Sequence, residues 1–208
     1  MATTQPSDSD QDIHILQPLM RDRGVITMPY ELRYDDFREV EQALDWVSLN
    51  YNHRPIVKFL GVGGDYTCAT ALGEMFRDHD AIGVMVGGSY SGHTISFMMC
   101  NERYIYPTAY LGVHSSSIMP NERPYTRDDF MIEAEIHEHF DDTIAQLFAD
   151  SCNNGKLHGV DFWRRFHSDA RTSIKLIASE EAVEYYGLAK YVDDMDEVSR
   201  FRLGKRRK

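Results

Sequence analysis

Segments with strand and helix patterns alternate along most of this chain of 208 residues, and this alternation constrains the fold more than any other feature. Short apolar runs indicate strands, and apolar residues that recur every three to four positions indicate helices. The predicted strands are residues 24–28, 55–61, 81–86, 104–106, 110–114 and 190–192. The predicted helices are residues 34–50, 68–77, 94–100, 127–151 and 180–186. Such alternation predicts an α/β fold with a mainly parallel sheet and helices on its faces.

The chain is expected to hold one folded domain between two tails. Its length suits a single domain with a sizeable core. Residues 1–14 are polar and lack apolar periodicity, which indicates a flexible arm. Residues 196–208 end in a strongly basic run, interpreted as a solvated tail, with a patch for an anionic partner as the alternative. The domain is therefore predicted at residues 15–195.

Charge and cysteine content argue against several classes of protein. The formal net charge of −11 argues against a dedicated nucleic-acid binder. No apolar run approaches the ~18 residues that a membrane span needs, and no positively charged start leads into an apolar signal core. The three cysteines, Cys68, Cys100 and Cys152, are odd in number and too widely spaced for a disulfide framework or a metal knuckle. We therefore expect a cytoplasmic protein that binds neither a membrane nor nucleic acid.

A glycine-rich segment, Gly61-Val62-Gly63-Gly64-Asp65, follows the second predicted strand. Ligands of parallel sheets bind beyond the carboxyl ends of the strands, which is where this segment lies. Glycine lets the backbone turn sharply and present bare N–H groups, so the segment is an anion cradle or oxyanion hole, or only a tight turn. No Gly-Lys-Ser/Thr follows and G-x-G-x-x-G is incomplete, so it is not a known phosphate-binding loop.

Two serines, Ser89 and Ser91, lie between the third predicted strand and a helix. A serine at such a junction presents its hydroxyl at the rim of the sheet, where N–H groups of the helix end stabilise negative charge. The G-x-S-x-G motif is absent, so the usual α/β-hydrolase elbow is not indicated. Each serine is thus either a nucleophile or a helix cap.

A histidine at the end of another strand is the predicted base. His114 ends the predicted strand at residues 110–114, where it can accept a proton from a serine on a neighbouring strand. The alternative role is a partly buried histidine that is hydrogen-bonded to a loop. His93 competes as a base, but it lies two residues from Ser91, and such residues do not face each other on a helix.

Asp169 is the predicted partner of this histidine. It precedes an apolar strip and the last predicted helix, and an aspartate there can orient the imidazole and stabilise its charged form. Three rivals stay open from sequence alone: Asp161, Asp193 and Asp194.

The helix predicted at residues 127–151 carries further titratable side chains. His137 and His139 stand two positions apart and point to different faces, so they are interpreted as surface or interface residues and not as a metal pair. The pair Asp141-Asp142 is interpreted as part of a solvated face.

Taken together, residues 15–193 resemble the ClpP family of serine peptidases, whose sheet-and-helix unit also occurs in the signal-peptide peptidase A and crotonase groups. The run ASEEAVEYYGL at residues 178–188 is similar to the stretch S-A-P-E-A-V-E-Y-G-L that follows the family's catalytic aspartate. The resemblance implies repeated β-β-α units and a protruding handle helix at residues 127–151. It also implies a set of site residues: Ser91 as nucleophile, His114 as base, Asp169 as third triad member, and Gly64 and Gly92 as oxyanion donors.

The chain also departs from the family pattern. The family has Ala-Ser-Met-Gly around its nucleophile, whereas this chain has Tyr90-Ser91-Gly92-His93, closer to the Ser-Gly-Gly of signal-peptide peptidase A proteins. No proline precedes the glycine pair, and Asp169 reaches the family position only with one inserted residue before Ile177. Such departures are typical of a divergent member, for example one encoded by a phage.

The resemblance implies a serine endopeptidase that hydrolyses unfolded proteins or peptides through an acyl-enzyme. Its family context implies a homo-oligomer of stacked heptameric rings with an internal chamber, a AAA+ unfoldase as partner, and no cofactor or metal. Two alternatives remain. One is a phage capsid-maturation peptidase that works without an ATPase, and the other is a non-proteolytic protein, either a crotonase-like acyl-CoA enzyme or an inactive ring subunit.

Overall fold

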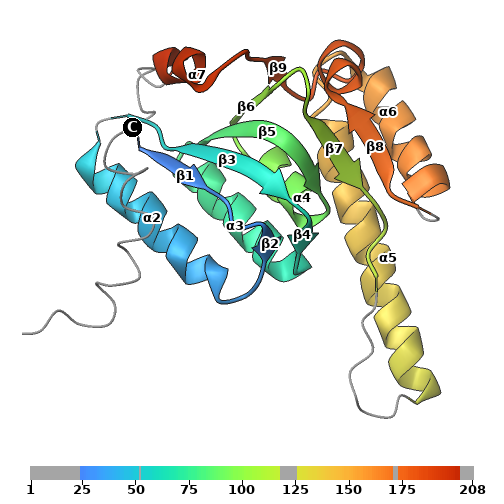
Figure 1. The fold of residues 1–208 in the computed structure, drawn as a ribbon. Helices are drawn as coiled ribbons and strands as arrows, with labels where there is room; N and C mark the ends of the chain where they lie inside the picture. Colours follow the sequence, from blue (N-terminus) through green and yellow to red (C-terminus); the bar gives the residue numbers. More distant parts are fainter. Residues whose placement is uncertain (1–23, 52, 118–125, 171–172, 202–208) are drawn as a thin grey trace, which may run out of the picture.

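A computed structural model describes residues 24–51, 53–117, 126–170 and 173–201. Its centre is a seven-stranded sheet in which β1, β3, β5, β6 and β9 follow one another, while β7 pairs with both β5 and β8 (Figure 1). The strands are β1 (Val25–Thr27), β3 (Ile56–Gly61), β5 (Ile82–Tyr90), β6 (Glu102–Ile105), β7 (Tyr110–Val113), β8 (Lys175–Ala178) and β9 (Lys190–Tyr191). The β7–β8 pair is antiparallel, and the other pairings of this sheet are parallel. The predicted α/β fold with a mainly parallel sheet is confirmed.

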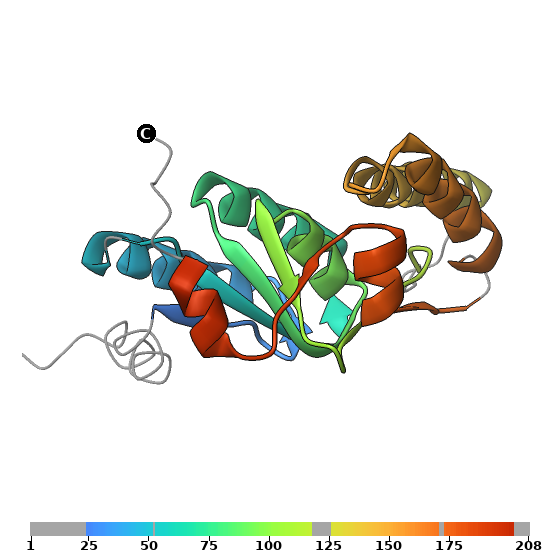
Figure 2. The same ribbon diagram turned by 90° about the horizontal axis from the view of Figure 1, so that it is seen from above.

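Three helices cover one face of the sheet: α2 (Asp36–Asn50), α3 (Tyr66–Asp78) and α4 (Gly92–Met98) (Figure 2). Val57 and Met85 point toward these helices and belong to the main core, together with residues such as Leu44, Leu72 and Phe97. Their chain neighbours Ile56 and Val84 belong to a second, smaller core on the opposite face. This division follows from the alternation of side chains along a strand, and it explains why these strands are apolar on both faces.

A short helix, α7 (Met195–Phe201), lies where the sequence predicts the start of the basic tail. Its Val198 is fully buried and packs in the second core with Val25 and Ile82. The helix carries Met195, Val198 and Phe201 at helical spacing, but it is short and leads into the basic run, which is why composition suggests a tail here. Residues 202–208 lie outside the described residues, as does the predicted arm at residues 1–14.

The long helix α5 (Arg127–Asp150) agrees with its predicted range and begins at a capping box formed by Thr126 and Asp129. Its first half projects beyond the body of the molecule (Figure 1). Its buried residues all lie in the second half, from Asp141 to Phe148. Within the described residues, no helix has the length and apolar character that crossing a membrane requires.

Several smaller elements differ from the sequence predictions. The last predicted helix is a short π-helical segment, η2 (Glu181–Tyr185). Helix α6 (Lys156–Arg165) and the π-helical segment η1 (Phe166–Ala170) were not predicted, and they continue one another beside α5. The glycine pair forms the strand β4 (Gly63–Gly64), which pairs in parallel with β2 (Glu31–Leu32) in a separate two-stranded sheet.

Candidate active site

Four predicted site residues line one cavity of about 600 Å³: Gly64, Ser91, Gly92 and His114. It lies at the carboxyl ends of β5 and β7, beside β4. Its remaining wall includes apolar residues from several elements: Leu32, Val62, Ile95, Val113, Phe140 and Ile144. The topology thus brings together four predicted residues that are up to 50 positions apart, because the carboxyl ends of neighbouring parallel strands meet at one edge of the sheet.

Ser91 stands on a strained turn between β5 and α4. Its backbone has φ +52° and ψ −124°, in a region that non-glycine residues rarely occupy. Although it is the N-cap of α4, its side chain makes no capping hydrogen bond. The Ser91 hydroxyl therefore does not cap the helix, which argues against the helix-cap alternative for this serine. Ser89 is fully buried and is not among the residues that line the cavity.

Backbone pairing links the turn at Ser91 to the strand that precedes His114. Tyr90 pairs with Gly112 in the parallel ladder, and Ser91 N–H donates to the Gly112 carbonyl at 2.8 Å. The buried Thr94 hydroxyl lies 3.0 Å from the Ser89 carbonyl and 3.1 Å from the Gly112 carbonyl, between the same two strands. The relative position of the two strand ends is therefore held by several hydrogen bonds.

The glycine pair approaches Ser91 more closely than any side chain would allow. Gly63 has φ +90°, and a Cβ atom there would lie 2.7 Å from the Gly92 nitrogen and 2.7 Å from Ser91 Cβ. A Cβ atom on Gly92 would lie 3.4 Å from the Gly64 nitrogen, so the backbones of the two predicted oxyanion donors are close neighbours. The next residue, Asp65, caps α3 by accepting from Cys68 N–H at 2.7 Å.

His114 is held by a backbone carbonyl. Its Nδ1 lies 2.6 Å from the Ser115 carbonyl oxygen. A carbonyl only accepts hydrogen bonds, so Nδ1 must carry the proton, and Nε2 of the neutral ring keeps its lone pair. No hydrogen bond joins Ser91 to His114 in the described part of the chain, and such bonds often tighten only when substrate binds.

The competing base, His93, is fully buried and packs edge-on against Phe59. It is not among the residues that line the cavity. Burial lowers its pKa to about 4, against the weaker opposing effect of the Pro29 carbonyl, so the ring is neutral at physiological pH. These observations agree with the prediction that His93 is not the base.

The structure orients Asp169 toward other groups. Its carboxylate accepts from the Ser168 hydroxyl at 2.8 Å and lies 3.9 Å from Lys175 Nζ. It is not among the residues that line the cavity, although the adjacent Ala170 carbonyl accepts from Ser115 N–H at 2.9 Å. Two of its rivals are engaged elsewhere, since Asp161 accepts from Tyr185 and Asp194 accepts from the backbone of α7. The third, Asp193, is not among the residues that line the cavity.

Sequence reasoning missed the contribution of α5 to the cavity wall. His137, interpreted as a surface or interface residue, lines the cavity together with Ser116. Asp141, interpreted as part of a solvated face, is only 8% exposed and accepts two hydrogen bonds from Ser116. That interpretation is therefore wrong for Asp141 and holds for its exposed neighbour Asp142. The available signal was helical spacing, because positions 137, 141 and 144 share one face.

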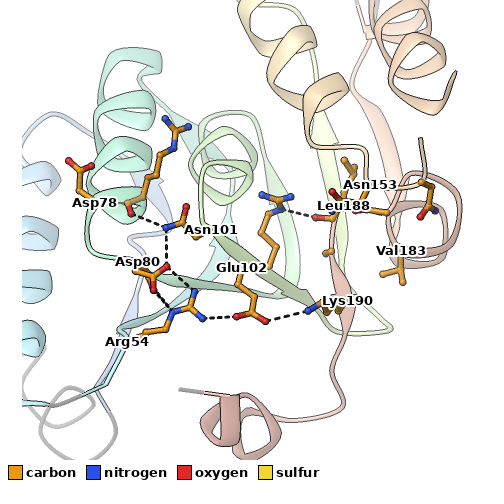
Figure 3. Close-up of a pocket in the computed structure, with 14 residues that line it drawn as sticks. Arg54, Asp78, Asp80, Asn101, Glu102, Asn153, Val183, Leu188 and Lys190 are labelled. Atoms are coloured by element: carbon orange, nitrogen blue, oxygen red, sulfur yellow. Dashed lines mark hydrogen bonds and ion pairs between the residues drawn. The ribbon is translucent and has the colours of Figure 1, made fainter. Parts of the chain in front are cut away.

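A second hollow, of about 860 Å³, lies at the amino ends of the strands (Figure 3). Arg54 is the centre of its charge network, with ion pairs to Asp80 at 3.1 Å and to Glu102 at 2.6 Å. Lys190 lies 3.4 Å from Glu102, and Asn101 donates to Asp80. Since these groups neutralise one another, we interpret the network as structural.

Cysteine and metal chemistry find no support in the described residues. Burial raises the pKa values of Cys68 and Cys152 to about 11 and that of Cys100 to about 12, so none supplies a thiolate near neutral pH. Within the same residues, no three His, Cys, Asp or Glu side chains are grouped as metal ligands.

Comparison with known proteins gives one informative result. No protein-family model matches the sequence. No curated protein matches it either. Among solved structures, a ClpP1 mutant from Listeria monocytogenes is similar with a TM-score of 0.66 and 15% sequence identity, over 88% of this chain and 98% of that one. A likeness at this identity concerns the fold, and together with the sheet topology it shows that this chain has a ClpP-like α/β fold.

Proposed function

We propose that the protein is a serine endopeptidase that hydrolyses peptide bonds through an acyl-enzyme on Ser91. The observation that carries this proposal is the strained turn at Ser91. The Ser91 side chain makes no capping hydrogen bond, and the residue lines the same cavity as His114. Strained backbone conformations of this kind cluster at active sites. The ClpP-like fold is compatible with this activity.

The proposed reaction uses the groups around the cavity in sequence. Ser91 Oγ attacks the peptide carbonyl carbon while His114 Nε2 takes the hydroxyl proton. The N–H groups of Gly64 and Gly92 stabilise the oxyanion of the tetrahedral intermediate. His114 then donates the proton to the leaving amine. In the second half of the reaction, the same nitrogen takes a proton from water as the water oxygen attacks the acyl carbon, and then returns that proton to Ser91 Oγ as the C–O bond breaks and the acid product leaves. The prediction that Asp169 orients His114 rests on the family resemblance.

Assembly into stacked rings of about seven subunits is part of the proposal, and it rests on the resemblance together with one surface of α5. Phe130, Met131, Ile132 and Ile136 are all at least 41% exposed on the projecting half of this helix. A monomer would leave this apolar surface in water, which favours its burial against other copies. Polypeptides would then be cleaved inside a chamber, after delivery by a AAA+ unfoldase.

Active-site labelling tests the proposed chemistry. A fluorophosphonate probe should label Ser91, as located by mass mapping, and Ser91→Ala should abolish labelling and lower kcat for a fluorogenic peptide by at least about a thousandfold. Ser89→Ala is the matched control, because this buried serine lies two residues away and off the cavity. Full peptidase activity in Ser91→Ala would refute the assignment.

The same experiment bears on the alternatives. A crotonase-like acyl-CoA enzyme or an inactive ring subunit does not need an activated serine, so an unlabelled Ser91 would favour one of these. A labelled Ser91 leaves the choice between a chambered peptidase and a capsid-maturation peptidase. Co-purification with a AAA+ ATPase supports the first, and co-purification with a capsid or scaffold protein supports the second.

A further inference from the structure

We propose that Asp141, on helix α5, is a positioning residue for His114. This inference rests on the proposed function and deepens it. Asp141 anchors Ser116, the preceding Ser115 carbonyl holds the Nδ1 proton of His114, and Nε2 is thereby kept ready to act as the base. The backbone carbonyl takes the place that the family resemblance gives to Asp169.

The first step is the contact between His114 and its own chain. Nδ1 lies 2.6 Å from the Ser115 carbonyl oxygen, a short hydrogen bond that selects one tautomer. In a serine triad this task falls to a carboxylate, which fixes the tautomer and orientation of the imidazole. A carbonyl can do the same only if its own peptide unit cannot rotate, since a rotated peptide would move the acceptor away.

The second step is what immobilises that peptide unit. Its nitrogen end is Ser116, whose N–H donates to Asp141 Oδ1 at 2.7 Å, and whose hydroxyl donates to the same oxygen at 2.9 Å. The Ser115–Ser116 peptide contains both the carbonyl that accepts from His114 and the N–H that Asp141 holds. Rotation of this unit would therefore break both hydrogen bonds together.

The third step concerns the rigidity of the anchor. Asp141 is buried in the well-packed half of α5, next to the core residues Ile144 and Ala145. On the other side, Ser115 N–H donates to the Ala170 carbonyl at 2.9 Å. The loop after β7 is thus held from both flanks. Buried carboxylates are costly unless they accept hydrogen bonds, and here the two donors come from the loop that carries the base.

The activity test compares substitutions of Asp141 with matched controls. Asp141→Ala should lower kcat by about 10- to 100-fold, with KM within about threefold, because the base is misplaced while the substrate cavity remains. Asp141→Asn should keep kcat within about threefold, because its amide oxygen accepts the same two hydrogen bonds. Asp142→Ala, the same change at the next and exposed position, should leave kcat unchanged, and Asp169→Ala should cost less than Asp141→Ala.

A second measurement tests the hydrogen bond between Ser116 N–H and Asp141 without relying on turnover. Hydrogen exchange followed by mass spectrometry should show at least about tenfold faster exchange of the Ser116 amide in Asp141→Ala, but not in Asp141→Asn. Ser116→Ala removes only the hydroxyl contact and keeps the N–H bond. It should fold normally and give an intermediate loss of kcat, which keeps the test decisive if Asp141→Ala is unstable.

The outcomes separate the two proposals. If wild-type protein is active and Asp141→Ala keeps full kcat, the positioning role is refuted while the serine peptidase stands. Unchanged exchange of the Ser116 amide in Asp141→Ala also refutes it. If wild-type Ser91 is neither labelled nor active, the proposed function is refuted, and the positioning role with it.

Discussion

At the scale of single residues, Ser91 and His93 show how two neighbours in sequence take opposite environments. Ser91 has a positive φ of +52° and opens onto the cavity, whereas His93 is fully buried behind it. Holding a non-glycine residue in such a conformation costs about 1 to 3 kcal/mol, which the surrounding core must offset. Gly63 leaves room for this turn, since a Cβ atom there would lie 2.7 Å from Ser91 Cβ.

The buried His93 predicts an acid-sensitive stability. Because burial lowers its pKa from 6.5 to about 4, the unfolded chain binds a proton first as the pH falls. The free energy of unfolding therefore has its full value above pH 6.5 and decreases by about 3 kcal/mol as the pH falls to 4. We expect urea unfolding of wild type between pH 7 and 4 to show this loss in excess of that of His93→Gln, which does not titrate.

The difference between wild type and His93→Gln separates the effect of His93 from that of the other titrating groups. His53→Gln is a suitable control, because this histidine is only half-buried and lies away from the cavity. Parallel stability curves for wild type and His93→Gln across this pH range would contradict the prediction.

At the scale of elements, α5 has two halves with different environments. The half from Asp141 onward packs on the core and lines the cavity, while the first half projects and exposes apolar side chains (Figure 1). A single apolar stripe thus continues from a buried surface to an exposed one. Intrinsic helix stability does not require this exposed stripe, and burial against another copy in the proposed assembly would cover it.

Substitution on this stripe tests the assembly. Ile132→Glu together with Ile136→Glu should convert a large oligomer to smaller species, because charges one helical turn apart would be buried against another copy. Multi-angle light scattering checks the mass. Leu49→Glu is the control, since Leu49 on α2 is 85% exposed and lies away from α5. A wild-type mass of about 24 kDa would contradict the proposed ring.

At the scale of the whole molecule, the two ends of the sheet have different roles. The carboxyl ends hold the cavity with Ser91 and His114, and the amino ends hold the network around Arg54 (Figure 3). Burial of Glu102 would raise its pKa, but hydrogen bonds from Tyr104 and Arg54 outweigh this effect and lower it. The network therefore stays charged, and it joins the starts of β3, β5 and β6.

Removal of Arg54 should weaken the fold and leave catalysis intact. The Arg54 side chain is 10% exposed, and its loss would remove the cation that pairs with Asp80 and leave Glu102 paired with the exposed Lys190. We expect Arg54→Met to lower the free energy of unfolding by about 2 to 3 kcal/mol, with kcat unchanged where the protein is folded. Urea denaturation gives the first quantity and a peptidase assay the second.

Arg77→Met is the matched control for charge. Its partner Glu74 and the arginine itself are both about half exposed, so the loss should stay below about 1 kcal/mol. Equal destabilisation by the two substitutions would contradict the structural role given to the Arg54 network.

The sequence alone predicted the fold class, and four of the five residues that it proposed for a site line one cavity. Apolar periodicity predicted α2, α5 and the central strands, because a buried face requires apolar residues at the period of the helix or strand. The glycine pair, Ser91 and His114 were found because each follows a strand, and strand ends of a parallel sheet converge. The short helices α6 and α7 were not predicted, although Leu157, Val160 and Trp163 in α6 and Met195 and Val198 in α7 recur at helical spacing. Each stripe spans only about two turns, which is a weak signal beside the long stripe of α5.

Only the tertiary structure showed which carboxylate lies beside the histidine loop. Asp141 and Asp142 are adjacent and chemically identical. Helical spacing puts Asp141 on the same face as the buried Ile144, but the sequence does not show which segment that face contacts. The difference arises because α5 packs its 137–141–144 face against the loop after β7, a contact between segments about 25 residues apart. The strained conformation of Ser91 is also a tertiary property, because its N–H is held by the Gly112 carbonyl of the neighbouring strand β7.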